Sequence, residues 1–221
     1  MTMGQADIRR LSPDAGIAIG PILFIIAILA ILAAAIAAGS GSFTAGTASE
    51  SNRTKSSALV EIGDNLKIGM DNITMSNGVS PTSVIIDPAA TTATIDLFSP
   101  TGGGIAPPST SMANIPGTDI WHYLVGPIAG LGTGAGNVIA VLSVAPGVCA
   151  EVNNRTTGVA LTPAAADLGN FYSDSPGVLG TVSGGSWPTA SPNLVGISTG
   201  CVSNSNSSST GTFFYQVLAI Q

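Results

Sequence analysis

The chain has 221 residues, of which 8% are charged and 5% aromatic, and its formal net charge at pH 7 is −6. Only six residues are lysine or arginine, so no basic stripe can hold a phosphate backbone, and nucleic acid is not an expected partner. Histidine, cysteine and carboxylate residues do not occur at the spacing of a zinc site. We therefore expect no metal site, no cofactor and no enzymatic activity.

The first predicted element is an uncharged apolar run, Ile17–Ala38, close behind Arg9 and Arg10. As a helix it would span roughly 33 Å, enough to cross the ~30 Å hydrocarbon core of a bilayer. The positive-inside rule then leaves residues 1–16 in the cytoplasm as a leader and sends everything after the run across the membrane. We expect a single-pass membrane protein whose first partner is the lipid bilayer.

The next segment, residues 39–48, is rich in glycine and serine. Glycine costs about 1 kcal/mol per site in a helix interior, so we predict that the helix breaks or loosens here into a flexible joint. The capping-box pattern Thr47–Glu50 predicts the start of a new, amphipathic helix over residues 49–77, ended by Asn77-Gly78. Its apolar residues recur at three- and four-residue spacing and are expected to pack in a core: Ala58, Leu59, Ile62, Leu66, Met70 and Ile73.

Residues 78–221 are predicted to form an exported β-rich globular domain, because short β-rich runs alternate there with glycine, proline and asparagine turns. One or two turns of helix are predicted at Pro146–Asn154, and long loops over Thr162–Thr199. The expected fold class is α+β, with a long N-terminal helix packed on an antiparallel sheet. The candidate strands are Ser83–Ile86, Thr91–Phe98, Asp119–Val125, Asn137–Val144 and Thr212–Ile220.

The two cysteines, Cys149 and Cys201, are predicted to form a disulfide. On the non-cytoplasmic side of a membrane, two cysteines far apart in sequence most often pair. Closing a loop of about 50 residues would stabilise the fold by about 4 kcal/mol in the chain-entropy model. A lone cysteine pair without further ligands is poor chemistry for a metal.

Two other patterns resemble parts of functional sites. Gly196–Gly200 matches G-x-S-x-G, but a nucleophile elbow needs a helix after it and a later histidine, and the single histidine, His122, comes earlier. A hydrolase is therefore not expected. Calcium binding by a loop remains an alternative, although no EF-hand spacing is present. The aspartates that could form one are Asp87, Asp96, Asp119, Asp167 and Asp174.

The layout resembles that of type IV pilins and type II secretion pseudopilins: one long helix, apolar and then amphipathic, before a β-domain with a late disulfide. Locally, Val148–Asn154 resembles the cysteine-containing turn of pilin-like proteins, and Thr212–Leu218 resembles their closing strand. The resemblance implies a structural subunit of a pilus-like or pseudopilus filament, with other pilin-like subunits as partners. It also implies an inner-membrane anchor, a periplasmic domain that becomes extracellular on assembly, and cleavage by a prepilin peptidase between Gly16 and Ile17.

The chain departs from the family pattern at the fifth residue of the cleaved form, which is Pro21 instead of glutamate. In the family this glutamate neutralises a neighbour's terminal amine inside the filament, so its absence favours a minor or divergent subunit. The alternative is a single-pass, membrane-tethered periplasmic or extracellular binding domain that does not polymerise. In a filament, small side chains would let helices pack closely in the core: Ala33, Ala34, Ala35 and Ala37.

Overall fold

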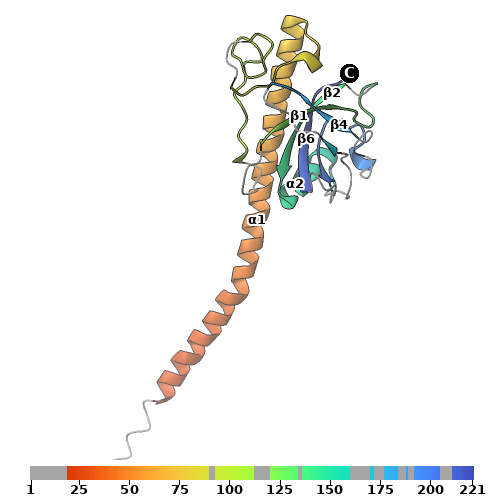
Figure 1. The fold of residues 1–221 in the computed structure, drawn as a ribbon. Coiled ribbons are helices and arrows are strands. Elements are labelled where there is room, and N and C mark those ends of the chain that lie inside the picture. The colour runs from red at the N-terminus through yellow and green to blue at the C-terminus, as the bar shows by residue number, and fades with distance from the viewer. Residues whose placement is uncertain are drawn as a thin grey trace, which may run out of the picture. The chain divides into compact units, whose positions relative to one another are not determined.

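The computed structural model describes residues 19–89, 93–111, 120–133, 136–159, 170–171, 177–183, 188, 192–204 and 211–221. Within these ranges only the backbone is described at residues 19, 21, 38–45, 170–171, 183 and 204. The fold is α+β, as predicted (Figure 1). The chain divides into two units, Met1–Ala48 and Ser49–Gln221.

Helix α1 is continuous from Ile19 to Asn77, over 59 residues. The helix therefore does not break over residues 39–48 or start anew at Ser49, whereas the predicted loosening of these residues stays a prediction. Each glycine costs about 1 kcal/mol but keeps its backbone hydrogen bonds, and extending a helix is far easier than nucleating a new one. The predicted end is confirmed, because Gly78 takes a φ of 63° and its N–H donates to the Thr74 carbonyl at 3.1 Å.

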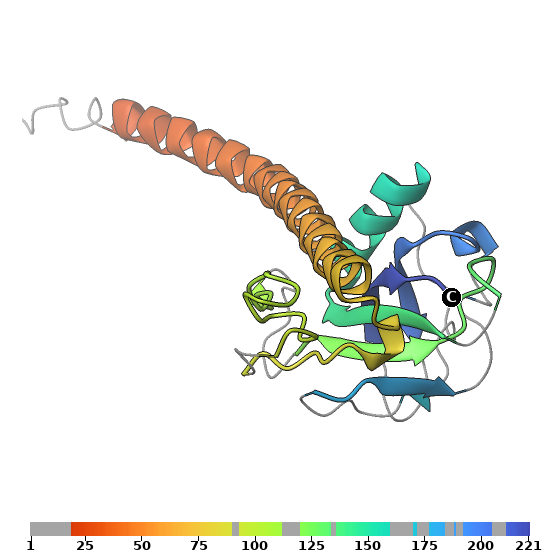
Figure 2. The same ribbon diagram turned by 90° about the horizontal axis from the view of Figure 1, so that it is seen from above.

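Within Ser49–Gln221, α1 packs on the sheet through the predicted apolar stripe. Leu59, Leu66, Met70 and Ile73 are fully buried or nearly so. Two glycines of α1 let other parts of the chain approach the helix closely. A Cβ at Gly63 would lie 2.8 Å from Oε1 of Gln216 on β6, and a Cβ at Gly69 would lie 2.9 Å from Cδ1 of Ile105, in the segment before β1. Figure 2 shows this part of the helix, drawn in yellow and orange, lying over one face of the sheet.

Six strands of the described chain form one sheet in the order β3-β4-β1-β2-β6-β5. The pairing of β1 with β4 is parallel and the other pairings are antiparallel, so the sheet is mixed and the predicted purely antiparallel sheet is wrong. Parallel strands need a long crossover connection, and the segment between β1 and β4, which contains β2 and helix α2, supplies one. The strands are β1 (His122–Gly126), β2 (Asn137–Val144), β3 (Asn170–Phe171), β4 (Gly180–Ser183), β5 (Thr199–Asn204) and β6 (Gly211–Ala219).

Three of the predicted strands are confirmed within a few residues, as β1, β2 and β6. The two earliest are not: the described part of this region contains the short 3-10 helix η2 (Pro81–Ser83) and a single isolated bridge between Ile85 and Asp96. The helix predicted at Pro146–Asn154 is present as α2 and is longer, Pro146–Thr157. Strands β3 and β4 lie in the segment that was predicted to be loop.

Both faces of the sheet carry a hydrophobic core. One cluster joins α1 and α2 to inward side chains such as Leu142, Phe214 and Leu218. The second lies on the opposite face, around Tyr215 and Leu194, the latter on the 3-10 helix η4 (Pro192–Leu194). Because neighbouring residues of a strand point to opposite faces, β2 and β6 are buried along almost their whole length.

Candidate functional site

The first candidate surface is the apolar part of α1. A surface helix of a soluble protein usually confines its apolar side chains to one stripe. Between Ile22 and Ile36 the large apolar side chains are instead exposed all round the helix, from 41% at Ile28 to 72% at Ile36. The predicted packing residues belong to this surface and are exposed as well: Ala33, Ala34, Ala35 and Ala37.

Several predictions for the N-terminal region concern residues that the structure does not describe. Among the residues that the structure describes, no helix is both long enough and apolar enough to be a candidate membrane span. The predicted span Ile17–Ala38 begins before the described chain, and side chains are described without interruption only from Ile22 to Ala37. Gly16 and Ile17, the predicted cleavage site, lie outside the described residues.

The second candidate region is α2 and the strand that it covers. Pro146 occupies the first turn of α2, where its missing N–H leaves no hydrogen bond unmade. The helix ends at Gly158, whose φ of 74° lets its N–H donate to the Asn154 carbonyl at 3.0 Å. Val148, Cys149, Val152 and Asn153 form its buried face.

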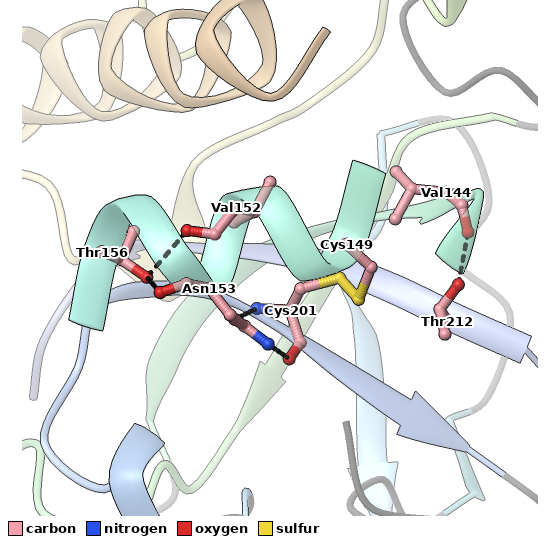
Figure 3. Close-up of a disulfide and its surroundings, with 7 residues drawn as sticks. All are labelled: Val144, Cys149, Val152, Asn153, Thr156, Cys201 and Thr212. Atoms are coloured by element: carbon pink, nitrogen blue, oxygen red, sulfur yellow. Dashed lines mark hydrogen bonds between the residues drawn. A yellow bond between two sulfur atoms is a disulfide. The ribbon is translucent and has the colours of Figure 1, made fainter. Parts of the chain in front are cut away.

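The predicted disulfide is confirmed. Cys149 on α2 and Cys201 on β5 are bonded, with their Cα atoms 5.3 Å apart, and neither is exposed to solvent (Figure 3). Close by, the Thr212 hydroxyl of β6 donates to the Val144 carbonyl at the end of β2. The disulfide therefore fastens α2 to an edge of the sheet, next to the point where two central strands meet.

Asn153 makes a second link between α2 and β5. Its Nδ2 donates to the Cys201 carbonyl at 2.9 Å, and its Oδ1 accepts the Cys201 N–H at 2.8 Å (Figure 3). The side chain is fully buried, where an unpaired amide would be costly. This role of Asn153 was not predicted; the available signal was a polar residue four positions after Cys149, on the same face of a helix.

Helix α2 also contacts the part of α1 with which the second unit, Ser49–Gln221, begins. Glu151 forms an ion pair with Arg53 at 4.0 Å, and Arg53 also lies 3.6 Å from Glu50. A Cβ at Gly147 would lie 2.5 Å from Asn52 Nδ2, so the helices approach closely there. Helix α2 is thus held by α1 on one side and by β5 on the other.

Asp96 is a buried carboxyl group in the segment between α1 and the sheet. Its Oδ1 accepts the Phe98 N–H at 2.8 Å, while Oδ2 has no hydrogen-bond partner among the described residues. Burial raises the pKa of Asp96 above its ordinary value of 3.8; the Phe98 hydrogen bond opposes the shift, and the negative charge of Asp87 adds to it. Among the described residues, no three histidine, cysteine or carboxylate side chains gather as metal ligands. Asp119, Asp167 and Asp174 lie outside the described residues.

This burial leads to a prediction about pH. Because the folded state favours protonated Asp96, the unfolded chain ionises first as the pH rises, and stability falls from the ordinary pKa upward. The free energy of unfolding of the wild type, relative to Asp96→Asn, should therefore decrease as the pH rises above the ordinary pKa of 3.8. Urea titrations of the detergent-solubilised chains measure this difference, and a difference independent of pH would contradict the assignment.

The structure does not bring Ser198 and His122, the residues of the G-x-S-x-G pattern and the single histidine, together. Ser198, the central serine of Gly196–Gly200, precedes β5, and its carbonyl accepts the Val217 N–H at 2.8 Å. His122 lies on β1, which β2 and β6 separate from β5. A shallow groove of ≈290 Å³ lies along α1, with one polar side chain, that of Asn65. Its other lining residues are Ile62, Leu66, Ile105, Ala106 and Pro108.

Comparison with known proteins adds no relatives. No family model, no curated protein and no solved structure matches this chain. The resemblance to pilins and pseudopilins is therefore supported by none of these comparisons.

Proposed function

We propose that the chain is a structural subunit of a type IV pilus-like or pseudopilus filament, anchored in the inner membrane by the first part of α1 before assembly. The observation that carries this proposal is the surface of Ile22–Ile36, which is apolar on every side of the helix. Apolar surface is unfavourable in water by about 25 cal/mol per Å². Lipid, and later the same helix of other copies, would cover this surface.

Transfer from lipid to a filament needs a further driving force, because lipid tails are as apolar as isoleucine or leucine. Close packing of helices can supply it where side chains are small. The exposed alanines from Ala33 to Ala37, interrupted only by Ile36, provide such a surface. Since α1 continues without a break to Asn77, the anchor and the globular unit share one helix.

The disulfide supports the predicted location of the globular unit. Disulfides persist in the periplasm and outside the cell, and are rare in the cytosol. Cys149 and Cys201 are paired and buried, with no free cysteine among the described residues. An oxidised domain on the far side of the membrane agrees with the orientation that Arg9 and Arg10 predict.

A membrane-tethered binding domain that never polymerises is the second candidate. The observation in its favour is Pro21, which stands where pilins have the glutamate that pairs with a neighbour's terminal amine. A filament subunit without this glutamate would be a minor or divergent one. Both candidates need the membrane anchor, and they differ in the fate of the leader.

Mass spectrometry of the mature chain separates the two. We expect the chain in membranes and in material sheared from the cell surface to begin at Ile17. Gly16→Val should block this processing, whereas Gly20→Val should not, because Gly20 has open space around it. A wild-type chain that keeps residues 1–16 and is absent from the sheared material would favour the tether.

A further inference from the structure

Among the residues that the structure describes, strand β5 forms one edge of the sheet, and its register shows which backbone groups face outward. The Val217 N–H donates to the Ser198 carbonyl, and this bond continues the pairing of β5 with β6 by one residue. Antiparallel ladders alternate between bonded and non-bonded pairs. Bonds to β6 therefore fall at even-numbered residues, and Thr199, Cys201 and Ser203 turn their N–H and C=O groups toward the open edge.

Asn153 occupies the central one of these positions. Its carboxamide donates to the Cys201 carbonyl and accepts the Cys201 N–H, as one residue of a neighbouring strand would do. The amide of asparagine offers the same kinds of donor and acceptor as a peptide group. A side chain of α2 thus stands where the next strand of the sheet would begin.

Other contacts hold α2 in this position. The disulfide ties Cys149 to the residue whose backbone Asn153 caps. On the opposite side, α2 meets α1 through the Glu151–Arg53 ion pair and the close approach of Gly147 to Asn52. The helix cannot leave the edge of β5 unless these contacts break.

We propose that α2 is an edge guard, which prevents β5 from pairing with β5 of a second copy of this chain. Two antiparallel β5 strands related by a twofold axis at Cys201 would place Thr199 of one copy opposite Ser203 of the other, so the edge is complementary to itself. An unprotected edge strand is a template for such pairing. The inference rests on the proposed function only in its expectation that many copies of this chain lie close to one another.

The test compares Asn153→Ala with the matched control Asn154→Ala, an exposed neighbour on the same helix, in the full chain in detergent micelles. In Asn153→Ala we expect the Cys201 amide to exchange its hydrogen about tenfold faster or more, while the Val202 amide, bonded to β6, is unchanged. Light scattering in excess thiol, which opens the Cys149–Cys201 bond that otherwise keeps α2 beside β5, should show a mass that rises with concentration for Asn153→Ala alone. Equal exchange and equal mass in both variants would overturn the proposal.

A third variant identifies the surface that associates. The Ser203 N–H faces outward, so Ser203→Pro removes no bond to β6 but blocks an added strand. In Asn153→Ala/Ser203→Pro, association should disappear while fast exchange at Cys201 remains; association that persists would refute pairing through β5.

If Asn153→Ala does not fold, the same comparison is made with Asn153→Leu, whose side chain is of similar size but has no donor or acceptor for the Cys201 backbone, with and without Ser203→Pro, and the same outcomes decide. All of these readouts are taken in detergent. They therefore do not depend on cleavage at Gly16 or on filament formation, and failure of the edge guard is distinguishable from failure of the filament proposal.

Discussion

Replacing Cys149 and Cys201 together by alanine is expected to lower the free energy of unfolding by about 4 kcal/mol. The two residues are 52 positions apart, so the bond removes much of the freedom of the unfolded chain. Both side chains are fully buried, so their truncation also leaves a small unfilled volume. Denaturant titration of the oxidised wild type and of the double variant, both in detergent, measures the loss.

Reducing the wild type separates the contribution of the disulfide to the free energy of unfolding from that of the change in side-chain volume. The wild type in excess thiol should approach the stability of the double variant, whereas the variant should not respond to thiol. The Asn153 hydrogen bonds use the backbone of Cys201 and survive the substitution, so the loss measures the disulfide and not the edge contact. A loss below about 1 kcal/mol would mean that the covalent link contributes little to this fold.

Arginines at Ile25 and Leu29 are expected to remove the chain from the membrane. Each arginine near the centre of a spanning helix costs roughly 2.5–3.5 kcal/mol in insertion, so the pair should cost about 5–7 kcal/mol. Both positions are more than half exposed on α1, so the substitutions disturb no packed core. The fraction of chain that stays in membranes through alkaline extraction measures the effect.

The matched control places the same charges on the same helix outside the apolar segment. Asn65 and Asn72 are exposed on the second part of α1, and Asn65→Arg/Asn72→Arg should leave membrane association unchanged. Equal retention of the two double variants would show that the apolar surface of α1 does not hold the chain in lipid.

Local pattern was sufficient for much of the fold. Strand β2 is found where its run of apolar and β-branched residues predicted it, at Asn137–Val144. The apolar stripe of α1 and the helix end at Gly78 follow from spacing and from the left-handed conformation that glycine allows. These features depend on residues close together in the sequence.

Features decided by distant residues were not predictable in this way. Strands β4 and β5, in the sequences GTVS and TGCVSN, lack an alternating apolar pattern and form because β1 and β6 offer edges to pair with. The helix did not break at residues 39–48, because helix on both sides outweighs the glycine cost. The cysteine pair was predicted as a disulfide, but the role of Asn153 depends on the register of β5 against β6.

Photo-cross-linking from residue 28 of the full chain in cells tests the central claim most directly. A photoreactive side chain in place of Ile28 should form adducts with lipid and, once filaments assemble, with the same helix of other copies; the same probe at Asn72 should form none with lipid. Adducts of residue 28 with lipid alone would support a membrane anchor and contradict assembly into a filament. Quenching by water, or cross-links only within its own chain, would contradict the account.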